Sequence, residues 1–378
     1  MMRAIALAVR QSIDGGSNHG PARTTLAPMT GYGAELSAAW ADHLAPRKPD
    51  APTVVSLFAG CGGSSLGYSM AGYRELLAVE WDDHAAAMFR LNFPDIPLHH
   101  GDVTQLDPAA LDLAPGELDV LDGSPPCQGF STSGRRSADD PRNDLFRQYV
   151  RLLDVWQPRA FVMENVSGLV KGKMKLKFAE MLRALKAAGP GYHVTVRLLD
   201  ASRFRVPQAR QRLIFLGLRN DLPGTLDHPL PLPGTLTVRD AWADLVGPGT
   251  LITLAPKAAV VVPSIRPGEN GSDPLKLAGR KASFFNLVRL HWSRPSPTIR
   301  KNVGGAGFTL HPDTDRAIGL GEVARLQSFP DEYRWTGSTY RQVFARVGNS
   351  VPPLLMRAIA TTVRDTLDTI DKRQEMAA

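Results

Sequence analysis

The chain has 378 residues, of which 43% are hydrophobic and 21% charged, so it can bury a core in roughly two or three domains and is neither a disordered tail nor a membrane protein. No apolar run approaches the roughly 18 residues that a transmembrane helix needs, and the apolar residues 4–9 are too few for the core of a signal peptide. Two cysteines without a Cys-x-x-Cys pair exclude a disulfide framework and a cysteine-rich zinc module, and they favour a reducing, cytoplasmic setting.

Basic residues outnumber acidic ones by 44 to 37, a net charge of +7, and the excess is concentrated in two stretches. Residues 274–312 contain no acid and seven lysines or arginines, and residues 181–219 contain eight of them with Asp200 as the single acid. Each stretch alone could be a solvated face. Together they favour a polyanionic partner, because cations near phosphates release counterions, and nucleic acid is the leading candidate.

Residues 1–50 show no sustained periodicity, and we expect a mostly flexible extension with one helix over residues 35–44. From residue 53 onward, short β-branched runs alternate with amphipathic stretches, which is typical of a mostly parallel sheet with helices on both faces. The predicted strands are residues 54–58, 76–80, 118–121, 161–163, 192–199 and 213–218. The predicted helices are residues 64–71, 83–93, 145–153 and 175–187.

Beyond these elements the pattern changes. Residues 220–300 hold 11 of the 30 prolines and little continuous periodicity, which predicts a small, loop-rich unit, although a disordered linker has a similar composition. Apolar side chains that such a unit can bury are Phe284, Phe285, Leu287, Val288 and Trp292. After Val351-Pro352-Pro353, a closing helix is predicted over residues 354–370, with proline at its start as helices prefer.

The first candidate site is a glycine-rich turn, Leu57-Phe58-Ala59-Gly60-Cys61-Gly62-Gly63, after the first predicted strand. Glycines let the backbone turn sharply and approach a ligand closely, and an acid about 20 residues later can accept hydrogen bonds from ribose hydroxyls. Glu80 is that acid. Asp102, in His100-Gly101-Asp102-Val103, follows a third strand that comes after the helix over residues 83–93, and there it could hold an adenine amino group. The alternative is a tight turn with a helix cap, and Cys61 is expected to be a small packing residue.

The second candidate site is Asp122-Gly123-Ser124-Pro125-Pro126-Cys127-Gln128-Gly129-Phe130-Ser131, which follows a predicted strand. We therefore expect Cys127 at the carboxyl edge of the sheet, where doubly wound folds bind ligands. The two prolines fix the backbone before the thiol, and a thiolate is a strong nucleophile when cations or amide donors favour it. A lone cysteine is usually an inert core residue, but these neighbours favour a nucleophile.

Two further candidates follow neighbouring strands. Glu164, in Glu164-Asn165-Val166, is expected at the same edge as Cys127, and a thiol beside a carboxyl group suggests attack on an electron-poor ring with a proton supplied alongside. In Gln208-Ala209-Arg210-Gln211-Arg212, Arg210 and Arg212 share a face if the segment is extended. Either arginine could bind a phosphate or a base oxygen, and the alternative is a solvated strand end.

In this order, the four segments resemble those of the DNA cytosine-5 methyltransferases. The resemblance runs from about residue 53 to residue 370, and its most specific part is the segment from Gly123 to Ser131. Two later segments also match, Arg325-Leu326-Gln327-Ser328-Phe329-Pro330-Asp331 and Gln342 through Gly348-Asn349-Ser350-Val351-Pro352. The resemblance implies an α/β fold, a Rossmann-like sheet of the S-adenosylmethionine-dependent methyltransferases, with a second, smaller, loop-rich target-recognition domain.

The resemblance implies S-adenosylmethionine as methyl donor, no metal, and a target cytosine flipped out of a specific double-stranded DNA sequence. Glu80 would hold the ribose of the donor, Trp81 would flank its adenine, and Asp102 would contact the adenine edge. The other donor-binding residues that it implies are Phe58, Gly60, Gly62, Asn349 and Ser350.

The resemblance also implies catalytic roles. Cys127 would attack carbon-6 of the cytosine, and Glu164 would hold the ring at N3 and the amino group so that carbon-5 becomes nucleophilic. Arg212 would contact the base oxygen, and Arg210 would help to fix the active-site loop. Carbon-5 then takes the methyl group, a base removes its proton, and the thiolate leaves. DNA contacts are implied on the loop after the cysteine, at Ser131, Ser133, Arg135 and Arg136.

The resemblance divides the chain into an N-terminal extension (residues 1–50), a catalytic and donor-binding domain (51–219 plus 338–378) and a target-recognition domain (220–337). In the acid-free stretch, Arg294 and Lys301 are candidate DNA contacts. The extension lacks a convincing helix-turn-helix. We expect a monomeric, cytoplasmic, nucleoid-associated enzyme, for which a cognate restriction endonuclease acting separately is the protein partner that the resemblance suggests.

Two other functions stay open at this point. A tRNA cytosine-5 methyltransferase of the same family would carry a Cys-Phe-Thr signature, where this chain has Gln327-Ser328-Phe329. The second is a DNA-binding regulator on an inactive methyltransferase scaffold. The chain keeps all four catalytic candidates, which an inactive protein would have no chemical need to retain.

Overall fold

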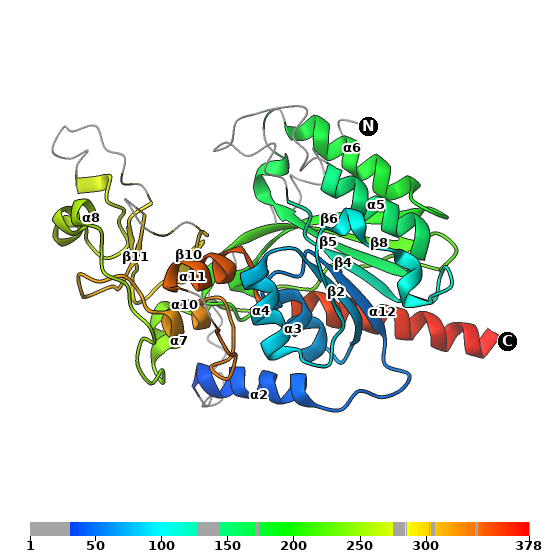
Figure 1. Ribbon diagram of the computed structural model, residues 1–378, viewed down its shortest axis with the longest axis horizontal. Coiled ribbons are helices and arrows are strands. Elements are labelled where there is room, and N and C mark those ends of the chain that lie inside the picture. The colour runs from blue at the N-terminus through cyan, green and yellow to red at the C-terminus, as the bar shows by residue number, and fades with distance from the viewer. Residues whose placement is uncertain are drawn as a thin grey trace.

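The computed structural model describes residues 31–126, 144–170, 172, 174–274, 284, 286–301, 303, 307–336 and 339–377. Its centre is a seven-stranded sheet in the order β3-β2-β1-β4-β5-β8-β6, with helices on both faces (Figure 1). In that order the strands are Leu98–His100, Arg74–Glu80, Thr53–Leu57, Val120–Gly123, Ala160–Val166, Gln211–Arg219 and Tyr192–Asp200. The predicted α/β class is confirmed.

The first five strands in that order are parallel, whereas β8 runs antiparallel to both β5 and β6. The mostly parallel sheet is therefore confirmed except at this edge. Ten residues, 201–210, connect β6 to β8, and a parallel crossover needs about a dozen or more. The strand order reverses between β1 and β4, so a ligand site is expected at the carboxyl ends of these two strands.

Each face of the sheet is covered by its own hydrophobic layer. Val54 in β1 packs into the layer that contains α3 (Gly63–Met70), α4 (Asp83–Asn92) and α12 (Pro353–Ala377). The next residue, Val55, packs into the opposite layer, which contains α5 (Asp144–Trp156) and α6 (Met174–Ala187). This alternation explains why a strand buried on both faces reads as a continuous apolar run.

The first described helix, α2 (Tyr32–Leu44), packs against α3. Its buried side chains, Tyr32, Leu36 and Ala39, recur at helical spacing on one face. The Tyr32 hydroxyl donates to the carbonyl oxygen of Arg205 at 3.0 Å, and Glu35 pairs with the same arginine at 2.6 Å. The predicted helix over residues 35–44 is thus confirmed; it begins three residues earlier, at Tyr32, and is packed against the core.

The C-terminal elements return to the first helix of the sheet domain. α10 (Leu320–Leu326) packs on α11 (Tyr340–Asn349), and α12 lies directly against α3. A Cβ atom on Gly67 of α3 would lie 2.6 Å from the Cβ of Met356, so the absence of a side chain permits this close approach. Residues from opposite ends of the sequence consequently meet beside the carboxyl ends of β1 and β2.

A smaller lobe lies to one side of the sheet, around α8 (Pro256–Val261) and β11 (Thr309–Leu310) (Figure 1). β11 pairs with β9 (Val288–Arg289). The lobe has its own hydrophobic cluster, formed by Ala258, Val262, Ile265, Leu287, Phe308, Leu310 and Ala317. Its described part is therefore folded and is not a disordered linker.

Segments on either side of this cluster pack into the larger core. Val238 and Trp242 of α7 (Val238–Trp242) and Val323 of α10 are buried in the layer that contains α3. β10 (Ser296–Pro297) pairs with β7 (Gln208–Ala209). The described residues also include short 3-10 helices, namely η1 (Val103–Gln105), η2 (Pro108–Leu111), η5 (Ser167–Val170), η6 (Ala201–Arg203) and η7 (Val262–Ser264). No helix in the described ranges is long and apolar enough to cross a membrane.

Candidate active site

The glycine-rich turn after β1 is held in a conformation that suits few side chains. Phe58, Gly60 and Gly62 all have positive φ angles, of 58°, 59° and 88°, in the left-handed region that favours glycine. A Cβ on Gly62 would lie 2.3 Å from the ring of Phe93, whereas a Cβ on Gly60 would meet no atom within 4 Å. The turn is packed on one side and open above Gly60.

Glu80, at the end of β2, is buried and bound by three backbone amides. Gly60 donates to its Oε2 at 2.7 Å, and the amides of Trp81 and Asp82 donate to its Oε1 at 3.0 and 2.8 Å. Burial raises the pKa of this carboxyl group, and the hydrogen bonds oppose that shift. The next side chain, Trp81, is 77% exposed. The indole ring of Trp81 therefore lies in solvent directly after the buried Glu80.

Asp102 and the end of α11 approach the same turn. Asp102 is exposed beyond β3 and accepts from the Thr104 amide at 2.9 Å. Ser350 is buried, with its hydroxyl 3.1 Å from the sulfur of Cys61. Burial raises the pKa of the Cys61 thiol to about 12, so it stays a neutral packing group. Asn349 is exposed. The structure therefore gathers the eight predicted donor-binding residues around one sheet edge.

Glu164 and Arg212 form an ion pair at the ends of β5 and β8. The Nε of Arg212 lies 2.5 Å from Oε1 of Glu164, and the two side chains are only 12% and 11% exposed. The antiparallel register sets this contact, because Val166 lies opposite Arg212 and Glu164 opposite Ile214. An arginine so close and so little hydrated fixes the orientation of the carboxyl group.

Arg210 is buried, and its guanidinium binds backbone rather than solvent. Its Nη1 donates to the carbonyl oxygen of Ile299 at 3.1 Å, and its Nη2 donates to that of Asn349 at 3.4 Å. Burial, followed by the charge of Arg212, lowers the pKa of Arg210, and Glu164 opposes this shift. The side chain thus links the junction of β7 and β8 to the backbone at Ile299 and at the end of α11.

The segment before the predicted nucleophile lies beside Glu164. Gly123, the last residue of β4, is opposite Met163, and the Asn165 side-chain amide donates to the carbonyl oxygen of Pro125 at 3.5 Å. Pro126 is the last described residue of this segment. The following predicted residues, Cys127, Ser131, Ser133, Arg135 and Arg136, lie outside the described residues.

The acid-free stretch is not uniformly a surface. Arg294 is exposed and Lys301 half-buried. Arg289, in contrast, is 4% exposed and donates to the carbonyl oxygens of Ile265, at 2.7 Å, and Thr314, at 2.9 Å. One of the basic residues that suggested a nucleic acid partner is thus part of the interior of the small lobe.

Sequence reasoning missed two buried polar clusters. Gln208 and Gln327 hydrogen-bond to each other in the core. Asp122 is buried beneath α3, and beside it the half-buried Glu75 has an enclosed carboxyl group, whose pKa burial raises to about 7. Gln208 and Gln327 both belong to segments that the sequence singled out, so their amides were the available signal. Asp122 directly follows a strand that was predicted to end at residue 121.

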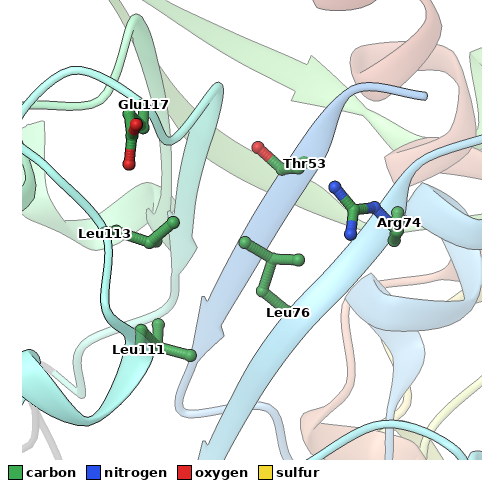
Figure 2. Close-up of a pocket in the computed structure, with 6 residues that line it drawn as sticks. All are labelled: Thr53, Arg74, Leu76, Leu111, Leu113 and Glu117. Carbon is green, nitrogen blue, oxygen red and sulfur yellow. The ribbon is translucent and has the colours of Figure 1, made fainter. Parts of the chain in front are cut away.

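A shallow hollow of about 570 Å³ lies at the opposite end of the sheet, between the starts of β1 and β2 (Figure 2). It is lined by Thr53, Arg74, Leu76, Leu111, Leu113 and Glu117. None of the predicted site residues lines it, and ligands of open α/β sheets bind at the carboxyl ends of the strands. Within the described ranges, no three His, Cys, Asp or Glu side chains are grouped as a metal site would require.

Comparisons with known proteins identify the family of the chain. A family model for C-5 cytosine-specific DNA methylase matches residues 52–245 and 272–365. The type II methyltransferase M1.HphI of Haemophilus parahaemolyticus is 36% identical over 82% of this chain and 86% of its own length. M.DdeI of Desulfomicrobium norvegicum is 31% identical over 82% and 88%.

Solved structures show the same fold. A prophage-encoded DNA modification methyltransferase of E. coli superposes with a TM-score of 0.67 at 25% identity, over 84% of this chain and all of that one. A DNMT2 structure from Spodoptera frugiperda, at 18% identity and a TM-score of 0.61 over 83% of this chain and all of that one, shares the fold. The resemblance drawn from the sequence is confirmed: the chain belongs to the C-5 cytosine-specific DNA methylase family and is a DNA (cytosine-5-)-methyltransferase.

Proposed function

We propose that the chain methylates carbon-5 of a cytosine flipped out of one specific double-stranded DNA sequence, through a covalent adduct between Cys127 and carbon-6. The observation that carries this proposal is the ion pair of Glu164 with Arg212, beside the segment that Asn165 ties to the end of β4. It supplies an oriented carboxyl group and a cation on the strand that neighbours the predicted nucleophile.

The family implies S-adenosylmethionine as methyl donor, and the residues around the glycine-rich turn fit such a molecule. The space above Gly60 is open, the exposed ring of Trp81 offers a face for stacking an adenine, and Glu80 offers a carboxylate to ribose hydroxyls. We assign Phe58, Gly62, Asp102, Asn349 and Ser350 to the same site. When bound, the donor supplies an electrophilic methyl group.

The reaction then divides among the residues of the chain. The Cys127 thiolate adds to carbon-6, and Glu164 holds N3 and the exocyclic amino group, so that the electrons gained by the ring make carbon-5 nucleophilic. Arg212 fixes Glu164 and contacts the base oxygen, while Arg210 holds the backbone around Ile299 and Asn349. After carbon-5 has been methylated, a base removes its proton and the thiolate leaves, which restores the aromatic ring and the enzyme.

We also propose a division of labour in DNA binding. Base edges are read by the target-recognition domain, residues 220–337, which includes the small lobe. We assign phosphate binding to Arg294 and Lys301 there and to Arg135 and Arg136 after the cysteine, together with Ser131 and Ser133. The enzyme works as a cytoplasmic monomer, and a separate restriction endonuclease of the same specificity is its functional partner, as the type II relatives suggest.

Two measurements test this proposal. Bisulfite sequencing of DNA from cells that express the chain should find one methylated sequence motif. DNA that carries 5-fluorocytosine at the target should form a trapped covalent adduct, because fluorine at carbon-5 cannot leave as a proton does. Methylation without a trapped adduct would contradict the role of Cys127, and methylation of tRNA but not of DNA would contradict the substrate.

A further inference from the structure

An ion pair joins two segments that the proposed donor site draws from distant parts of the chain. Asp82 follows Trp81 at the end of β2, and Arg346 lies in the last turn of α11, 264 residues later. Nε of Arg346 donates to Oδ1 of Asp82 at 3.0 Å, and its Nη2 donates to Oδ2. Two parallel hydrogen bonds fix the orientation of the pair as well as its distance. The contact therefore sets how Trp81 lies relative to Asn349.

Neighbouring contacts reinforce this junction. Gln342, one turn earlier in α11, contacts the ring of His84 at the start of α4. Asp82 is also the N-cap of α4, since its Oδ1 accepts from the Ala85 amide at 2.9 Å. Asp82 thus binds the start of one helix and the end of another, and two successive turns of α11 touch the segment that carries Trp81.

The ion pair also closes a ring of contacts around the glycine-rich turn. The Ser350 hydroxyl donates to the carbonyl oxygen of Arg346 at 2.9 Å and lies 3.1 Å from the sulfur of Cys61. On the other side, Glu80 binds the amides of Gly60 and Asp82. Every segment of the proposed donor site except Asp102 is therefore linked, directly or through one neighbour, to this pair.

The pair is only partly hydrated, with side-chain exposures of 32% for Asp82 and 20% for Arg346. Burial alone would raise the pKa of the Asp82 carboxyl group, but hydrogen bonds from Arg346 and the Ala85 amide bring it below its ordinary value. The ion pair therefore favours the carboxylate form of Asp82. An arginine in the last turn of a helix also stabilises that helix through its dipole, and this purely structural role predicts an effect on stability without one on the donor.

We infer that Arg346 is a positioning residue for the methyl donor: through Asp82 it holds the end of α11 against the Trp81 segment, so that both sides of the donor site are in place before binding. The inference rests on the proposed donor site. It predicts that loosening the pair weakens donor binding while leaving DNA binding unchanged.

The test uses the full-length chain and S-adenosylhomocysteine as the binding probe, with Kd measured by titration calorimetry. The variants are Arg346→Gln, Asp82→Asn and the double variant, with Arg341→Gln, exposed on the same helix, as the matched control. Asp82→Asn keeps the oxygen that caps α4. Each single variant should raise Kd by roughly tenfold, the cost of losing a charge-assisted pair. The double variant should match either single one, because both remove the same contact.

Kinetics separate positioning from a structural role. KM for the donor should rise in step with Kd, while kcat at saturating donor changes by less than about twofold, as expected when binding alone is lost. Arg346→Lys, which keeps the charge without the planar fork, should recover only part of the affinity. Thermal unfolding is recorded for each variant to show that it is folded, and its DNA affinity should stay close to that of Arg341→Gln. Unchanged Kd in the folded single variants, or additive effects in the double variant, would overturn the inference.

Two further variants distinguish this outcome from failure of the donor site itself. Trp81→Ala and Glu80→Ala should weaken binding of the same probe if the donor binds above Gly60. Weakening by these variants, with none from Arg346→Gln, overturns only the role of the ion pair. No weakening by any of them overturns the proposed donor site and the inference with it.

Discussion

The side chains of Gln208 and Gln327 hydrogen-bond to each other in the interior, where the Nε2 of Gln208 donates to the Oε1 of Gln327 at 3.0 Å and neither residue is exposed. Gln208 also accepts from the Ile299 amide at 3.0 Å and donates to the carbonyl oxygen of Leu326 at 3.1 Å. Gln327 donates to the carbonyl oxygen of Val347 at 2.6 Å. One pair of amides thus ties β7, α10 and α11 to the segment that enters from the small lobe.

Replacing Gln208 with alanine should lower the free energy of unfolding by about 2–4 kcal/mol, because the buried groups that it binds lose their partners without gaining water. Gln327→Ala should have a similar effect, and the double variant should lose less than the sum. Urea denaturation measures all three. Gln105→Ala, at an exposed position, is the control and should change stability by less than about 0.5 kcal/mol. An effect of Gln208→Ala as small as this would contradict the structural role.

These glutamines show where sequence reasoning ends. Both lie in segments that the sequence singled out, but the two glutamines are 119 residues apart in the sequence. No local pattern specifies a contact at that separation. The apolar strands were predicted well, because runs of buried side chains are a local signal. β4 continues to Gly123, two residues beyond its predicted end at residue 121. The buried Asp122 is accommodated there by contacts that α3 supplies, such as the Tyr68 hydroxyl at 3.4 Å, and no local pattern reveals them.

The site was predicted in part for the same reason. Glu80 and Glu164 could be placed because each follows an apolar strand, and parallel strands end at one edge. The contact of Arg212 with Glu164 was not predicted, since it depends on β8 running antiparallel to β5. The contacts of Ser350 in the donor site depend on the packing of α12 against α3. The family resemblance predicts that packing, whereas the local sequence pattern does not.

The buried carboxyl group of Glu75 should make the stability of the protein depend on pH. Its Oε1 accepts from the Ser65 hydroxyl at 2.9 Å, and burial raises its pKa from 4.5 to about 7. The folded state therefore holds a proton that the unfolded state releases. This contribution to stability is fully present below about pH 4.5 and is lost as the pH rises through about 7.

Glu75→Gln keeps the acceptor for Ser65 but cannot ionise, so it should remove this dependence. Relative to the parent chain, the variant should gain about 2 kcal/mol of unfolding free energy between pH 5 and pH 8. This is less than the full shift of the Glu75 pKa implies, because residual structure in the unfolded chain reduces the difference between the two states. Urea unfolding at both values measures the difference. Glu375→Gln, exposed near the end of α12, should follow the parent at both pH values, and a parallel course for Glu75→Gln would show that Glu75 is ionised in the folded state.

Cys127→Ser should reduce methyl transfer by roughly a thousandfold or more, as loss of a catalytic nucleophile does. A serine hydroxyl has a far higher pKa than a thiol, and the proposed mechanism provides no base to activate it. The affinity for S-adenosylhomocysteine should stay within about twofold of the parent, because the donor site uses other residues. Turnover close to that of the parent would exclude the covalent mechanism, whereas lost donor binding would mean that the variant disturbs the fold.

Arg294 and Lys301 should contribute to DNA affinity without affecting its sequence preference. Each is replaced with alanine, and affinity for the methylated sequence and for an unrelated duplex is measured over a range of salt concentrations. Removing an accessible cation that binds a phosphate should weaken both complexes alike and lower the salt slope by about one unit. Exchange of residues 222–297 for those of a relative should instead change which cytosine is methylated, with Cys127 still active.

The buried Arg289 provides the contrast within the same acid-free stretch. Its guanidinium binds backbone carbonyls of the small lobe, so Arg289→Ala should lower the free energy of unfolding by about 3 kcal/mol. The folded fraction of Arg289→Ala should bind DNA with the same salt slope as the parent chain, because a buried cation releases no counterion from DNA. If the salt slope falls for Arg289→Ala but is unchanged for Arg294→Ala, DNA approaches the lobe on another face. Unchanged slopes for Arg294 and Lys301 would mean that these side chains are only solvated.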